Sequence, residues 1–161
     1  SHKTMQPKIG LSDKNRKETC KILSVLLSNE IVLYIKTRKF HWNVTGNSFI
    51  ELHLLFQEQY KELEVIIDEV AERINKLGEF TIGTLQEFSE LTTLKESPGK
   101  NPSQKDMIAK LLEDHEQVIT EIRKHVKHEN KENTDAGTVD FITGLMQQHE
   151  TIAWKLRRYL N

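Results

Sequence analysis

Cysteine is almost absent from this sequence: Cys20 is the only one in 161 residues. An intramolecular disulfide is therefore excluded, and with it the small secreted folds that disulfides hold together. The sequence also lacks a secretory signal pattern and any apolar run of the ~20 residues that a membrane-spanning helix needs. We therefore expect an intracellular, cytoplasmic protein without a membrane partner.

Proline is also rare in the sequence, and the net charge is small. The three prolines, Pro7, Pro98 and Pro102, lie outside the helical patterns. Lysine and arginine total 23 and aspartate and glutamate total 24, so the net charge of −1 gives no overall attraction to nucleic acid. The length suits one domain over residues 1–161, with residues 1–11 expected as a flexible tail.

Apolar residues recur at helical spacing along most of the chain, and no strand pattern competes with them. The predicted helices cover residues 12–42, 49–77, 85–91, 104–129 and 139–160. Ser12 is expected to cap the first helix, and capping boxes are expected at Ser48–Glu51 and Thr84–Glu87. The sequence thus predicts an all-α fold, a ferritin-like four-helix bundle with a short helix in its long crossover.

Two histidines and two carboxylates mark residues 41–74 as a candidate metal site. Asp68 and Glu72 are four residues apart on the second predicted helix, so their carboxylates share a face. His53 and Asp68 are 15 residues apart, or roughly 22 Å along that helix. One metal centre cannot span this distance, but antiparallel packing of two copies would bring His53 toward the partner's Asp68. His41 would join His53 from the preceding helix.

Other interpretations of the same residues remain open. A histidine beside an apolar stripe is often a hydrogen-bonded core or interface residue, and an acidic pair is often a solvated helix face. A di-iron centre within one bundle typically uses Glu-x-x-His pairs. None occurs here. Imidazole and carboxylate together suit iron, and also zinc or manganese.

Three stretches carry a resemblance to a known family: HWNVTG at 41–46, AERI at 71–74 and HETIAWKLRRYL at 149–160. With them the chain resembles the Dps family of mini-ferritins over nearly its whole length. The resemblance implies a hollow shell of twelve subunits that oxidises Fe(II), usually with hydrogen peroxide, and stores the ferric product. Such a ferroxidase protects the cell against oxidative stress.

The resemblance also implies the site residues. His41 and His53 would come from one subunit, and Asp68 and Glu72 from its two-fold partner. Trp42 would lie beside the site as an alternative sink for oxidising equivalents. Gln57 departs from the family pattern, which has an acidic residue there, so we expect a weaker second iron and reduced efficiency.

The family alignment places Asp135 and Asp140 around three-fold pores that admit cations. The alternatives are a helix cap for Asp135 and a solvated position for Asp140. The remaining histidines of the last two long helices are expected at the surface. These are His115, His125, His128 and His149.

DNA binding in the nucleoid, with little or no ferroxidase activity, is the competing function. Some family members contact phosphates through a lysine-rich tail. Here the tail carries only Lys3 and Lys8, followed by Lys14, Arg16 and Lys17. A third interpretation is a helical oligomer without metal chemistry, which the amide at Gln57 would favour.

Overall fold

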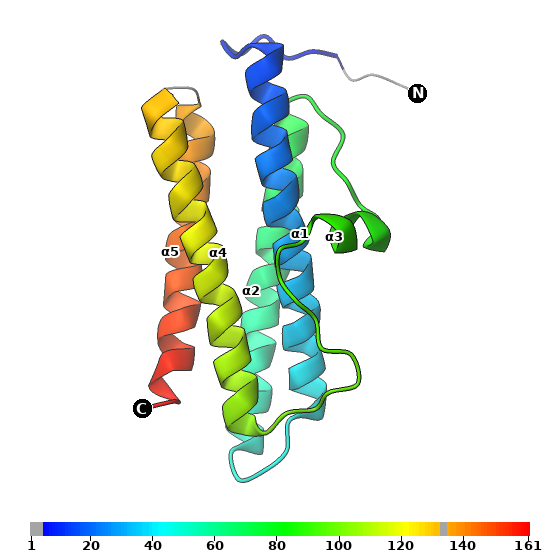
Figure 1. The fold of residues 1–161 in the computed structure, drawn as a ribbon, viewed down its shortest axis with the longest axis vertical. Coiled ribbons are helices and arrows are strands. Elements are labelled where there is room, and N and C mark those ends of the chain that lie inside the picture. Colours follow the sequence, from blue (N-terminus) through cyan, green and yellow to red (C-terminus); the bar gives the residue numbers. More distant parts are fainter. Residues whose placement is uncertain (1–4, 133–134) are drawn as a thin grey trace.

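The computed structural model describes residues 5–132 and 135–161. Its described residues form five helices and no strand: α1 (Asp13–Asn43), α2 (Phe49–Lys76), α3 (Leu85–Leu91), α4 (Gln104–Glu132) and α5 (Ala136–Arg158). The long helices pair as α1 with α2 and α4 with α5, and each pair is antiparallel (Figure 1). The crossover that carries α3 runs the length of the bundle, so α2 and α4 are parallel (Figure 1). The predicted all-α, ferritin-like bundle is confirmed.

Capping explains where the helices begin. Ser12 caps α1 by accepting a hydrogen bond from the Asn15 amide at 3.0 Å. Thr84 and Glu87 form the predicted capping box of α3, and the predicted bounds of that helix are confirmed. The box predicted at Ser48 is wrong. Ser48 has φ −105° and ψ 25°, outside the extended region from which a capping hydroxyl reaches the helix amides.

The last two long helices differ from their predicted bounds. α4 continues to Glu132, three residues beyond the predicted end, and α5 begins at Ala136 rather than at 139. Asp135 accounts for the earlier start of α5, because its carboxylate accepts from the Thr138 amide at 3.1 Å as an N-cap. The predicted polar connection between these helices includes residues 133–134, which lie outside the described part of the chain.

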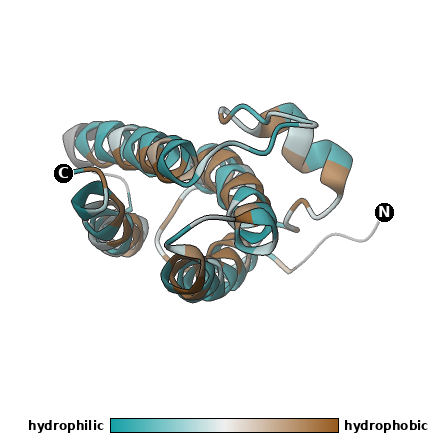
Figure 2. Ribbon diagram, turned by 90° about the horizontal axis from the view of Figure 1, so that it is seen from below, coloured by the Kyte–Doolittle hydropathy of each residue, from teal (hydrophilic) through white to brown (hydrophobic). Residues whose placement is uncertain are grey.

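Each long helix has an apolar and a polar side, as Figure 2 shows in a view along the bundle. The apolar sides meet in one core, in which Leu23, Phe56 and Leu111 have no exposed surface. Burial of this kind is the main favourable contribution to folding. Among the described residues, no helix is both long and apolar enough to cross a membrane.

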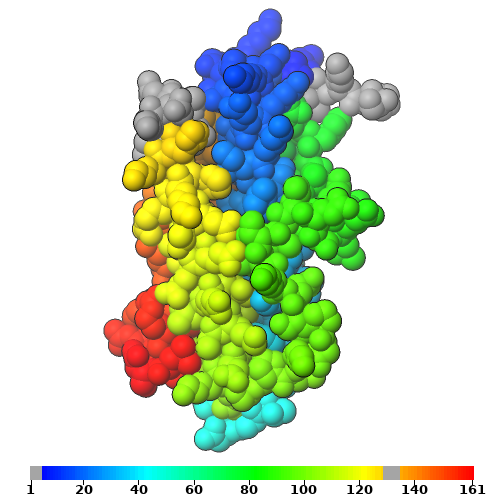
Figure 3. Space-filling view, viewed as in Figure 1, coloured from blue at the N-terminus to red at the C-terminus, as the bar shows by residue number. Residues whose placement is uncertain are grey.

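The crossover is fixed to α1 by side chains that satisfy its backbone. Lys36 and Lys39 donate to the carbonyl oxygens of Lys95 and Lys100, each at 2.8 Å. Asn29 accepts from the Thr93 amide at 2.8 Å. In the space-filling view the crossover therefore lies against the bundle next to α4 (Figure 3).

Candidate metal centre

The two candidate histidine ligands lie together where α1 turns into α2. His41 is in the last turn of α1, and His53 is in the second turn of α2. Their rings stack with centroids 3.8 Å apart and planes inclined by 15°. His41 is buried, with 7% of its surface exposed, and His53 is partly exposed. The structure therefore brings together the two histidines that the sequence singled out.

Reciprocal hydrogen bonds set the orientation and tautomer of both rings. Nδ1 of His41 lies 2.7 Å from the carbonyl oxygen of His53, and Nδ1 of His53 lies 2.8 Å from that of His41. A carbonyl oxygen only accepts, so each Nδ1 must carry the hydrogen and donate it. Each Nε2 is then an unprotonated lone-pair donor, the form that a metal ion requires. Bonding to the backbone thus prepares both rings as ligands.

Two aromatic rings enclose the histidine pair. Phe49 stacks on His53 with centroids 5.2 Å apart, and Tyr60 meets His41 edge-on, also at 5.2 Å. Both belong to the apolar stripe of α2, so their sequence pattern indicated only core packing. Such packing limits the rotamers of the two imidazoles and reduces the entropy that metal binding would otherwise cost.

The two candidate carboxylates lie elsewhere on the chain. Asp68 and Glu72 are exposed on α2, roughly 22 Å and roughly 28 Å beyond His53 at the usual helical rise. Within one copy, no cluster of three or more His, Cys, Asp or Glu side chains could hold a metal ion in the described ranges 5–132 and 135–161. Within one copy, the histidine pair and the two carboxylates therefore remain apart.

The face of α2 that carries the carboxylates also exposes large apolar side chains. Ile50, Leu54 and Val65 are 60%, 55% and 58% exposed. These residues form one stripe at spacings of three or four, which we call the α2 outer stripe: Ile50, Leu54, Gln57, Lys61, Val65, Asp68 and Glu72. Exposed apolar side chains that recur along one face of a helix are typical of interaction surfaces.

The remaining candidates near the histidines are Gln57 and Trp42. Gln57 is partly exposed one turn beyond His53 on α2, the place of the missing carboxylate. Trp42 follows His41 and is 62% exposed, with the Arg38 guanidinium carbon 5.5 Å from its ring centroid. Arg38 also lies 4.3 Å from the Tyr60 ring centroid, which connects Trp42 to the aromatic wall of the site.

The two candidate pore residues differ in their surroundings. Asp135 is buried, caps α5, and has a carboxylate oxygen 3.6 Å from the guanidinium of Arg73. Its role as a helix cap, one of the two alternatives from the sequence, is thus confirmed. Asp140 is exposed on the next turn of α5. Of these two residues, only Asp140 presents a solvent-exposed carboxylate in the isolated subunit.

The surface position expected for the remaining histidines is wrong for two of them. His115 and His149 have no exposed surface and lie in the bundle core, whereas His128 is exposed. The physical reason is register. Apolar residues stand three and four positions to either side of both buried histidines, so each falls in the buried stripe of its helix.

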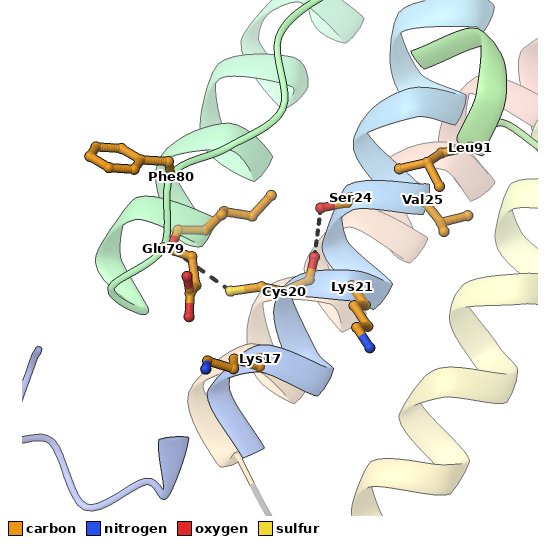
Figure 4. Close-up of a pocket in the computed structure, with 9 residues that line it drawn as sticks. Lys17, Cys20, Lys21, Ser24, Val25, Glu79, Phe80 and Leu91 are labelled. Atoms are coloured by element: carbon orange, nitrogen blue, oxygen red, sulfur yellow. Dashed lines mark hydrogen bonds between the residues drawn. The ribbon is translucent and has the colours of Figure 1, made fainter. Parts of the chain in front are cut away.

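A cavity of about 550 Å³ lies far from the histidine pair, between α1 and the segment that follows α2 (Figure 4). Cys20 lines it beside Ser24, Glu79 and Phe80. Burial, with a smaller contribution from Glu79, raises the pKa of the Cys20 thiol to about 11. The thiol is therefore protonated at neutral pH and is a poor nucleophile and a poor metal ligand.

Comparison with known proteins gives a consistent picture. Residues 20–161 match the family model of the ferritin-like domain. A low temperature-induced protein of Nostoc sp. is 45% identical over 152 residues, covering 94% of this chain and 85% of that protein. The DNA protection during starvation protein 2 of Bacillus anthracis is 31% identical, covering 90% of this chain and 98% of that protein.

Two solved structures extend the likeness to the fold. The Dps of Thermosynechococcus elongatus superposes with a TM-score of 0.86 at 31% identity, covering 92% of this chain and 93% of that one. The Dps protein of Vibrio cholerae, described as one of the ferritin-like diiron-carboxylate proteins, gives a TM-score of 0.90 at 27% identity. In that comparison both chains are covered completely.

Proposed function

Because this chain belongs to the Dps family of ferritin-like proteins, we propose that it oxidises Fe(II) with hydrogen peroxide and stores the ferric product. The reaction takes place at sites between two-fold-related subunits, and twelve subunits enclose the store. Zinc and manganese bind the same ligands as competing ions.

The observation that carries this proposal is the prepared histidine pair. His41 and His53 each present an unprotonated Nε2, yet no carboxylate of the same described chain joins them in a metal-binding cluster. Asp68 and Glu72 lie on the α2 outer stripe, beside apolar side chains that are exposed to water in the isolated subunit. Antiparallel association of two α2 helices along this stripe supplies both carboxylates to the partner's histidines. It also buries the apolar side chains of the stripe.

The ligand set fits the chemistry of iron. Two neutral imidazoles and two carboxylates balance the charge of Fe(II) and leave coordination positions for the oxidant. Two Fe(II) ions and two protons reduce one hydrogen peroxide to two waters and give two Fe(III). The protein positions the iron and fixes the Nδ1–H tautomer of the two imidazoles, and the metal carries out the electron transfer.

Gln57 sets the limit of this site. Its amide oxygen can bind a metal ion or a coordinated water, but it brings no negative charge. We therefore propose that the site holds one iron firmly and a second one weakly.

Gln57→Asp is expected to raise the affinity for the second Fe(II) by about tenfold, because each added carboxylate strengthens the local attraction for a cation. Anaerobic Fe(II) titration measures the affinity, and stopped-flow absorbance after peroxide addition measures the rate. Gln57→Glu tests whether charge alone suffices. Identical stoichiometry and rate in wild type and Gln57→Asp would contradict the role of Gln57.

Cations reach the store through acidic positions near the start of α5. We propose that Asp140, with Asp135 behind it, lines a pore between subunits and attracts Fe(II) from solution. The exposed carboxylate of Asp140 gives the larger part of this attraction, because Arg73 offsets the charge of Asp135.

DNA binding is the second candidate function, and the names of the relatives support it. The chain offers few phosphate contacts for it. Arg16 is buried and donates to the Leu77 carbonyl at 2.9 Å, so it is withdrawn from the surface. Lys3 lies outside the described residues, and Lys8 and Lys14 are exposed. A gel shift at low salt, repeated at high salt, decides between a salt-dependent DNA complex and none.

A further inference from the structure

Three of the four long helices place an ionisable side chain in the middle of the apolar core. Glu30 of α1, His115 of α4 and His149 of α5 have no exposed surface. None belongs to the iron site, because His41 and His53 lie at the far end of α1 and the start of α2. Buried ionisable groups are rare unless they are paired. We call these three residues the core triad.

The core triad is a linear chain of hydrogen bonds. Nε2 of His149 lies 2.5 Å from Oε1 of Glu30, and Nδ1 of His149 lies 2.8 Å from Nδ1 of His115. His149 therefore uses both ring nitrogens and links the other two residues. The two outer atoms of this hydrogen-bonded series are Oε2 of Glu30 and Nε2 of His115. Neither has a hydrogen-bond partner among the described residues.

The number of protons on the core triad follows from these contacts. Each of the two short contacts needs one hydrogen between its heavy atoms. With only these two hydrogens the triad is a carboxylate and two neutral imidazoles, which leaves a net negative charge in the core. A third hydrogen, on Nε2 of His115, makes the triad neutral. Burial strongly penalises net charge, so the three-hydrogen state is favoured.

The neighbouring ionisable groups in the described structure do not supply the positive charge that would balance Glu30 without this third hydrogen. Glu62 of α2 interacts electrostatically with His149, but burial, and then the charge of Glu58, raise the pKa of Glu62. Asp114, next to His115 on α4, is already paired with Lys36 of α1 at 2.6 Å. The charge of Glu30 is therefore balanced inside the core triad itself.

We propose that the core triad is an acid-sensitive lock of the bundle. In its closed state the triad carries the three hydrogens counted above, one of them shared between Glu30 and His149. One further proton, on His115, opens the lock, that is, it destabilises the contact between the two rings. In the closed state His149 donates from both nitrogens and His115 is neutral. The further proton would place two imidazolium rings in contact at 2.8 Å with only one carboxylate to balance them.

The surroundings of His115 agree with this assignment. Burial, and then the charge of His149, lower the pKa of His115 well below its usual value of 6.5. As the pH falls through about 6.5, the unfolded chain binds a proton at His115 and the folded chain does not. The contribution of His115 to stability is therefore complete above pH 6.5 and is lost progressively as the pH falls below it.

The size of this effect follows from the ordinary histidine pKa of about 6.5 in the unfolded chain. Between pH 7.5 and 5.5 the His115 effect changes the unfolding equilibrium constant by about tenfold. Substitution of a histidine with a purely structural role would shift stability equally at both pH values.

Urea unfolding of the assembled protein at pH 7.5 and 5.5 tests the proposal with His115→Gln. The amide of glutamine keeps a donor and an acceptor but does not titrate. His128→Gln, at an exposed site on α4, the helix that also carries His115, is the matched control. Relative to the control, acidification should stabilise His115→Gln by about tenfold in the unfolding constant.

A His115→Gln protein whose stability responds to acidification as that of His128→Gln does would overturn the proposal. Zinc or iron retained at one ion per subunit in His53→Ala but lost in His115→Gln would also overturn it, since a metal ion would then occupy the place of the proton. If a variant does not fold, deuterium exchange at the Cε1 position of each histidine in the wild type replaces it. His115 should then titrate at a lower pH than His128, and an equal midpoint contradicts the lock.

Discussion

His41→Ala is expected to reduce peroxide-driven Fe(II) oxidation by more than about 100-fold, the largest change in activity that we predict for one side chain. In the proposed site the substitution removes one ligand and loosens the second. His53 donates to the backbone carbonyl of residue 41 and stacks on the ring that is lost, so its own orientation is weakened. Stopped-flow absorbance at matched iron loading measures the loss.

His128→Ala is the control for this experiment, because His128 is exposed on α4 and contacts neither histidine of the site. Its rate should equal that of the wild type. Circular dichroism and the size of the assembled protein show whether His41→Ala still folds and associates. A correctly assembled His41→Ala protein with the wild-type rate would contradict the assignment of His41 as a ligand.

Val65→Glu is expected to separate the subunits and, with them, to remove the iron site. Val65 is 58% exposed on the α2 outer stripe, three residues before Asp68. Association along this stripe would bury the new carboxylate without a partner, at a cost on the order of 3–5 kcal/mol. This corresponds to a loss of at least about 100-fold in association. All four ligand residues remain in the chain, so loss of activity would reflect loss of the interface.

Val65→Ala is the matched control, because it shortens the side chain without adding a charge. It should remain assembled and active. Sedimentation velocity measures the size, and the oxidation assay is run on the same samples. A Val65→Glu protein that stays assembled and oxidises iron at the wild-type rate would show that the α2 outer stripe is not the interface.

Local signals in the sequence predicted local structure well. The bounds of α3 followed from Thr84 and Glu87 alone, because both partners of a capping box lie within one turn. The same four-residue pattern failed at Ser48, where the short turn after Gly46 sets a backbone conformation that the pattern does not report. Start positions of helices are therefore predictable only where the preceding turn allows the cap to form.

The residues of the candidate metal centre could be proposed from the sequence, but the arrangement of the two histidines could not. His41 and His53 could be identified from their types and spacing. Their stacking and reciprocal bonds depend on how α1 and α2 meet, which spacing along one helix does not contain. The core triad had a visible signal that was not used: Glu30, His115 and His149 each occupy the apolar stripe of a helix, where an ionisable residue needs a buried partner.

The distance between His53 and Asp68 remains the feature on which the functional account depends. It follows from helical rise alone, and in the proposed site one subunit therefore supplies the imidazoles and another supplies the carboxylates. Two half-site variants separate these contributions. One carries His41→Ala with His53→Ala, and the other carries Asp68→Ala with Glu72→Ala.

Co-assembly of the two half-site variants is the most direct test. Each variant alone should be inactive. At a two-fold interface between one subunit of each kind, one site regains all four ligands and the other loses all four. Random mixing then restores about one quarter of the wild-type rate of peroxide-driven Fe(II) oxidation. A mixed assembly no more active than its parents would contradict a site shared between subunits.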